Sequence, residues 1–69
     1  MAYEIVFTKS VDNKDFPEAS MYSHNSIVVD EDKPQIYMTG IGCVKLSVDG
    51  RDMIYNNVLY IKPSYYDES

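Results

Sequence analysis

Apolar and polar residues alternate along several short stretches of this chain, which is the two-residue period of β-strands. Every second residue from Tyr3 to Phe7 is apolar and aromatic or branched, which predicts a strand over residues 3–9. A β-branched run predicts a short strand over residues 26–30, and extended structure resumes over residues 35–39. The pattern therefore predicts a chain built from strands.

The clearest signal of secondary structure is the segment Tyr37–Tyr55, which predicts two strands joined by a turn at Asp49-Gly50. Both central residues of a type I′ turn need positive φ, which Gly adopts freely and Asp tolerates. A two-residue loop fixes the pairing of the strands on either side. It pairs Val48 with Arg51, Ser47 with Asp52, Leu46 with Met53, Lys45 with Ile54, and Val44 with Tyr55.

A second tight turn is predicted at Asn56-Asn57, because asparagine also tolerates positive φ. It would return residues 58–61 along the preceding strand and complete a three-stranded meander. One face of this meander would carry Val44, Leu46, Met53, Tyr55, Val58 and Tyr60, and the other would still expose Ile54, Leu59 and Ile61.

Two apolar faces on one sheet both require cover, because a half-solvated antiparallel sheet alternates more cleanly. We therefore expect an all-β protein, a small antiparallel sandwich or barrel with a C-terminal three-stranded meander. The remaining face would bind a second copy or another protein, unless its apolar residues are ordinary scattered surface side chains. The predicted interface residues are Ile54, Leu59, Ile61, Tyr60, Tyr65 and Tyr66.

The predicted domain covers residues 1–64, with a long polar connection at residues 10–25. That connection is a functional loop, a mobile arm or a crossing between two sheets. Gly40-Ile-Gly42 marks a bulge or bend. Residues 65–69 form an aromatic and acidic tail that either frays or docks on a neighbour.

The length limits how stable such a domain can be. A chain of 69 residues forms one domain, and domains of this size bury only ~60% of their unfolded surface. One cysteine and one histidine cannot form an internal disulfide or a four-ligand zinc site. Oligomerisation is the remaining source of stability.

The net charge is −5, and the chain has no Lys/Arg cluster that could follow a phosphate backbone. Direct nucleic-acid binding is therefore not expected. The acidity fits either an ordinary solvated surface or a mimic of nucleic acid that blocks a basic groove of a host enzyme. The mimic surface would consist of Asp30, Glu31, Asp32, Asp67 and Glu68.

No arrangement of residues predicts catalysis, a cofactor or a metal site. His24 lies beside Ser23, but a triad needs a rigid scaffold with a pocket and an oxyanion hole. Cys43 has no basic neighbour, so we expect a buried, inert thiol. Residues 30–32 lack the spacing of a calcium loop, and Gly40-Ile-Gly42 lacks the third glycine and the helix of a nucleotide loop.

The N-terminal residues lack a signal-peptide pattern, and no run reaches the ~20 apolar residues of a membrane span. The run Tyr37–Gly50, followed by an apolar strand, resembles a recurrent piece of bacteriophage structural β-sandwich modules. Those modules often place Trp after the Asp-Gly, where this chain has Arg51-Asp52-Met53. The resemblance implies a capsid decoration or tail-associated protein that acts by assembly, in the virion or the host cytoplasm.

Overall fold

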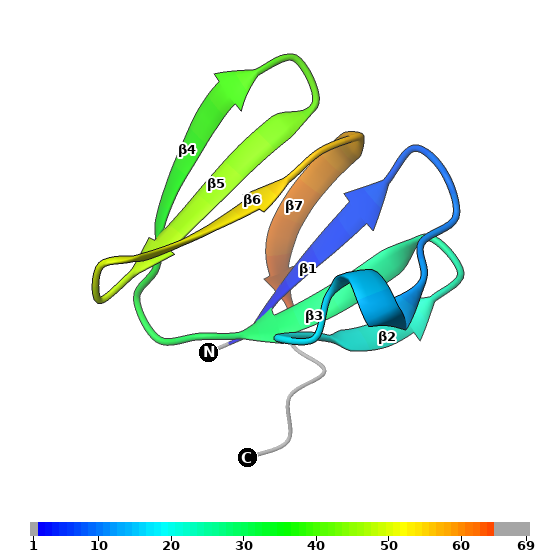
Figure 1. Ribbon diagram of the computed structural model, residues 1–69, viewed down its shortest axis with the longest axis horizontal. Coiled ribbons are helices and arrows are strands. Elements are labelled where there is room, and N and C mark those ends of the chain that lie inside the picture. The colour runs from blue at the N-terminus through cyan, green and yellow to red at the C-terminus, as the bar shows by residue number, and fades with distance from the viewer. Residues whose placement is uncertain (1, 65–69) are drawn as a thin grey trace.

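The computed structural model describes residues 2–64, which form seven strands in two antiparallel sheets (Figure 1). The first sheet has four strands in the order β2 (Ser20–Ser23), β3 (Ser26–Asp30), β1 (Ala2–Phe7) and β7 (Val58–Ser64). The second has three strands in the order β4 (Gln35–Gly40), β5 (Cys43–Val48) and β6 (Arg51–Tyr55). The predicted all-β class with two antiparallel sheets and a three-stranded meander is confirmed.

The Asp49-Gly50 hairpin forms as predicted. Asp49 has φ 51° and Gly50 has φ 82°, as a type I′ turn requires. The register of β5 with β6 matches the predicted one at every pair from Val48 with Arg51 to Val44 with Tyr55. Local turn chemistry therefore determines this part of the fold.

The last strand of the predicted meander is different. Residues 58–64 do not return along β6 but cross to the first sheet, where β7 pairs with β1. Asn57 has the expected positive φ of 61°, yet the turn joins the two sheets instead of closing a hairpin. β4 takes the open place beside β5, so the meander consists of β4, β5 and β6.

Packing between the sheets explains why β7 leaves the meander. In the first sheet β7 sets Ile61 opposite Ile5 and Val58 opposite Phe7. Val58 is buried and Ile61 packs against the core, so both contribute to the layer between the sheets. Without β7, β1 would be an edge strand and its apolar residues would lose this flank.

The core lies between the two sheets and is formed from their facing sides. Its fully buried members are Ile5, Phe7, Ile27 and Val29 from the first sheet and Val44, Leu46 and Tyr55 from the second. Phe16 joins this layer: its ring centroid lies 5.3 Å from that of Phe7 and 5.7 Å from that of Tyr55. Three aromatic rings thus close one side of the core.

The polar connection of residues 10–25 has structure of its own. It contains the 3₁₀ turn η1 (Asn13–Asp15), and the side chain of its N-cap residue, Asp12, accepts a hydrogen bond from the Lys14 N–H. It also contains β2, which pairs with β3 at the edge of the first sheet. The segment is therefore partly a strand hairpin, in addition to being a connection.

Candidate interaction surface

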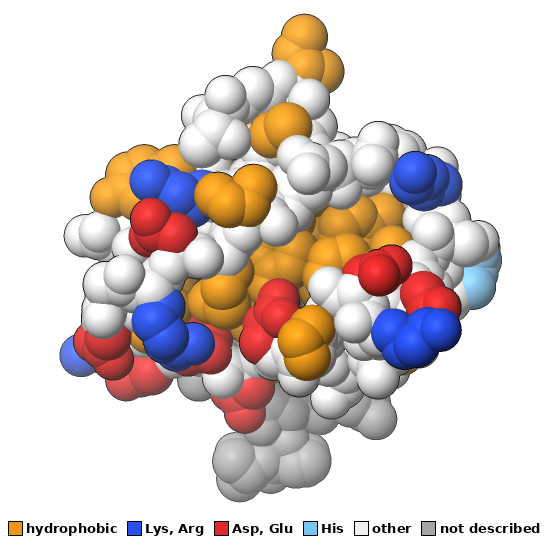
Figure 2. Space-filling view, in the orientation of Figure 1, with side chains coloured by type: hydrophobic (Ala, Val, Ile, Leu, Met, Phe, Trp, Pro, Cys, Tyr) orange, Lys and Arg blue, Asp and Glu red, His pale blue; other side chains and the backbone are white. Residues whose placement is uncertain are grey.

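β4 is a sheet edge whose six residues are all exposed. The exposed fractions are 40% for Ile36, 44% for Tyr37 and 71% for Met38. We call these three residues the β4 edge surface. Figure 2 shows hydrophobic side chains exposed over the region where Figure 1 places β4 and β5.

The hydrogen-bonding pattern identifies which main-chain groups of β4 are free. A two-residue turn is closed by a hydrogen-bonded pair, here Val48 with Arg51, and such pairs alternate along antiparallel strands. Lys45 therefore directs its N–H and C=O toward β4, where its partner is Tyr37. The N–H and C=O of Ile36 and Met38 consequently point away from the sheet.

The side chains of β4 divide between the two faces of its sheet. Ile36 pairs with buried Leu46 and Met38 with buried Val44, so both lie on the inner face, at a margin that the first sheet leaves exposed. Tyr37 lies on the outer face, with the Lys45 ammonium 4.9 Å from its ring centroid. The edge thus presents apolar groups on one face and an aromatic ring on the other.

The other described edges carry features that discourage pairing with another chain. β2 is only four residues long, begins and ends with serine, and has an irregular register with β3. β6 begins with two charged residues, Arg51 and Asp52. β7 contains Lys62 and Pro63 and a bulge at Leu59. Short length, charge, proline and bulges are the usual protections of an edge strand. β4, with the sequence Gln-Ile-Tyr-Met-Thr-Gly, is longer than β2 and contains no charge and no proline, and its own register shift lies after Met38, between Met38 and Gly40.

The sequence-predicted interface residues do not form one surface. Ile54 is 55% exposed on the outer face of β6, whereas Leu59, 60% exposed, and Tyr60, 48% exposed, lie on β7 of the other sheet. The prediction that Tyr60 shares a face of the meander with Val44 and Tyr55 is wrong, because β7 pairs with β1. Ile61 packs against the core and does not face outward. Tyr65 and Tyr66 lie outside the described residues.

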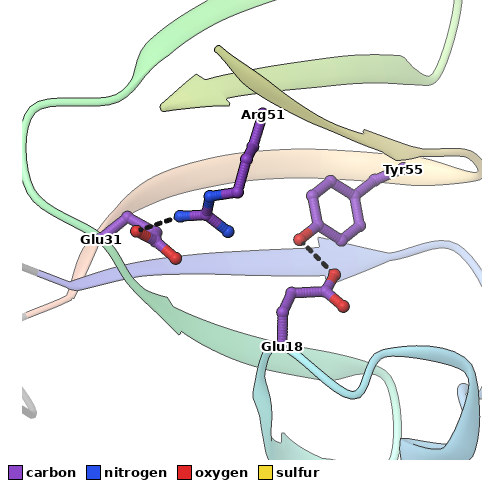
Figure 3. Close-up of polar contacts among 4 residues, drawn as sticks. All are labelled: Glu18, Glu31, Arg51 and Tyr55. Atoms are coloured by element: carbon purple, nitrogen blue, oxygen red, sulfur yellow. Dashed lines mark hydrogen bonds and ion pairs between the residues drawn. The ribbon is translucent and has the colours of Figure 1, made fainter. Parts of the chain in front are cut away.

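The predicted acidic surface is partly paired. The carboxylate of Glu31 accepts a hydrogen bond of 3.2 Å from the Arg51 guanidinium, as Figure 3 shows. Asp30 and Asp32 are exposed on either side of it. Asp67 and Glu68 lie outside the described residues. The ion pair connects the segment after β3 to the start of β6, so Glu31 acts between the sheets and is not a free surface charge.

A second polar contact between the sheets is made by Tyr55, whose hydroxyl donates a 2.7 Å hydrogen bond to Glu18 (Figure 3). Burial raises the pKa of the Tyr55 phenol far above its ordinary value, and the hydrogen bond to the Glu18 carboxylate raises it further. Tyr55 therefore stays protonated and donates. The contact connects β6 of the second sheet to the segment that precedes β2 of the first sheet, so it links the two sheets.

Ser23 and Cys43, which were considered as catalytic candidates, form hydrogen bonds within the fold. The Ser23 hydroxyl lies within hydrogen-bond distance of Asn25 and Ser26, where it supports the β2–β3 turn. Cys43 is partly buried, not fully buried, and its thiol donates to the Asn56 side chain at 3.2 Å. Among residues 2–64, no group of three or more His, Cys, Asp or Glu is placed to bind a metal ion. No helix in this part of the chain is long and apolar enough to span a membrane.

Comparisons of the chain with protein-family models, with curated proteins and with solved structures gave no match. The β4 edge surface is therefore the feature of this protein that indicates a function. Ile36, Tyr37 and Met38 were not predicted as an interface, although residues 35–44 contain no charged side chain, which is a signal of such a surface.

Proposed function

We propose that this protein is a non-enzymatic interaction module that self-associates through the edge of β4. The observation that carries the proposal is the combination at β4 of six exposed residues, an unpaired main-chain edge and no charge. Such an edge is a template for adding a strand from another chain.

Pairing at this edge would also add stability to a small domain. Ile36 and Met38 expose apolar area at the margin of the inner face, and burying such area is favourable by about 25 cal/mol per Å². Association of folded copies raises apparent stability by mass action. Self-association therefore supplies the support that a 69-residue chain without a disulfide needs.

We further propose that the module is a bacteriophage structural or accessory protein. The support is the resemblance of residues 37–50 to bacteriophage structural β-sandwich modules, together with an edge suited to assembly. A capsid decoration or tail-associated protein acts by binding its neighbours and needs no catalytic residue.

The alternative, an acidic inhibitor that mimics nucleic acid, has less support. Its central residue Glu31 is already paired with Arg51, and Glu4 forms a 3.7 Å ion pair with Lys62. Two carboxylates are thereby partly neutralised within the protein. The observations favour the apolar edge over the acidic surface.

Light scattering after size exclusion, at low and at high salt, tests the proposal. We expect a multimer whose mass does not fall at high salt, because contacts of an apolar strand edge are not screened as charge contacts are. A monomer at all concentrations would refute self-association. A complex with a basic protein that dissociates as the salt concentration rises would instead favour the acidic inhibitor.

Two matched variants identify the surface. Met38→Lys adds a charge at the most exposed apolar position of the edge, and Ile54→Lys adds the same charge at an exposed apolar position of β6 in the same sheet. We expect Met38→Lys to be monomeric and Ile54→Lys to keep the wild-type mass. The opposite result would place the interface on the outer face of β6.

A further inference from the structure

We propose that two copies of this chain pair antiparallel through β4 about a two-fold axis at Tyr37, with Ile36 of each copy opposite Met38 of the other. The inference rests on the proposed self-association and specifies its geometry. The result is one continuous sheet that runs from β6 of one copy, through both β4 strands, to β6 of the second.

The free main-chain groups select this register. Ile36 and Met38 direct their N–H and C=O groups outward, as the alternation of pairs with β5 requires. When Ile36 lies opposite Met38 of the second copy, each N–H donates to the facing C=O. Every outward group of these two residues is then used, in both copies.

The neighbouring registers use fewer groups. If Ile36 lay opposite itself, Met38 would face Pro34, which precedes the strand and has no N–H to donate. If Met38 lay opposite itself, Ile36 would face Gly40. Gly40 pairs with Cys43 beyond a register shift, so the N–H and C=O of Gly40 face Cys43 and do not point outward. Both registers leave outward groups unpaired, which costs free energy once water is excluded.

The side chains fit the same arrangement. At the axis the two Tyr37 residues form a pair without mutual hydrogen bonds, the kind in which side chains approach most closely. Each Tyr37 ring keeps its contact with Lys45 of its own copy. On the other face, Ile36 lies beside Met38 of the second copy. Because β4 has no charged residue, the two-fold axis brings no like charges together along the strand, despite the net charge of −5 per copy.

Disulfide trapping tests the register in a Cys43→Ser background, which removes the native thiol. We expect Tyr37→Cys to form a disulfide-linked dimer on mild oxidation. Paired residues of this kind have Cα atoms about 4.5 Å apart, within the range of a disulfide. Gln35→Cys, on the same face of the same strand, is the control. Its two copies would lie four residues apart along the strands, about 13 Å, and should not link.

A second variant tests the main-chain bonds while retaining the tyrosine. Met38→Pro removes an outward N–H without touching a hydrogen bond to β5, so the monomer should fold with an unchanged circular dichroism spectrum. We expect it to lose the dimer at concentrations where the parent is dimeric. Tyr37→Pro is the contrast, because it removes an inward N–H and should destabilise the monomer itself.

The outcomes separate the two proposals. A dimeric parent with efficient linkage through Tyr37→Cys, little through Gln35→Cys and a monomeric Met38→Pro supports the register. A dimeric parent in which Gln35→Cys links as well as Tyr37→Cys, or in which Met38→Pro stays dimeric, overturns this geometry and leaves self-association standing. A monomeric parent overturns both.

Discussion

The hydrogen bond between Tyr55 and Glu18 makes a specific prediction about stability. The Tyr55 residue is 1% exposed and its ring packs against Phe16, whereas the carboxylate that it contacts belongs to an exposed residue. Tyr55→Phe keeps the ring and removes only the donor. A hydrogen bond to a charged group contributes about 1.5–3 kcal/mol. Because Glu18 can take up water once the phenol is gone, we expect a loss near the lower end, about 1.5 kcal/mol.

Urea unfolding at a fixed protein concentration measures this loss. For a domain of this size the denaturant slope is about 1 kcal/mol per M, so the midpoint should fall by about 1.5 M. The matched control is Tyr60→Phe, which removes a phenol hydroxyl from a side chain that is 48% exposed on β7, away from the β4 edge surface. The control should change the free energy of unfolding by less than about 0.5 kcal/mol.

A double-mutant cycle with Glu18→Gln isolates the contact from other effects of each substitution. We expect the double variant to be less destabilised than the sum of the single variants. If Tyr55→Phe and Tyr60→Phe lower the free energy of unfolding equally, or if the effects of the changes at Tyr55 and Glu18 simply add, the hydrogen bond does not link the sheets energetically.

Three further predictions concern the turn, the core and pH. Gly50→Ala should lower the free energy of unfolding by about 1 kcal/mol, because φ is +82° there, whereas Gly40→Ala should be neutral; thermal unfolding compares them. Leu46→Ala should cost about 3 kcal/mol in urea unfolding, because Leu46 is fully buried, and Ile54→Ala less than about 0.5 kcal/mol. The raised pKa of Tyr55 means that the folded state keeps a proton that the unfolded state loses above about pH 10. The contribution of Tyr55 to the free energy of unfolding is therefore fully present below that pH and decreases as the pH rises above it. In Tyr55→Phe, the urea midpoint of unfolding should fall less steeply across this pH range than it does in the parent.

Several parts of the structure follow from short stretches of sequence. Asp49-Gly50 determines its own turn and hence the register of β5 with β6, because a two-residue loop leaves no freedom in the pairing. The same register fixes which side chains of residues 43–55 face the core. By contrast, β2 has no such signal: its four residues are all exposed, so no alternation of apolar side chains marks the strand.

The pairing of residues 58–64 with β1 depends on the tertiary structure and not on the local sequence. The turn at Asn56-Asn57 predicted pairing with β6, whereas the strand pairs with β1 and places Val58 and Ile61 between the sheets. This pairing joins residues more than fifty positions apart in the chain. That pairing and the placing of β4 beside β5 leave β4 as an edge. The candidate interaction surface could not be predicted for the same reason: whether Ile36 and Met38 are covered depends on the order of strands and the extent of the opposing sheet, which local sequence does not encode.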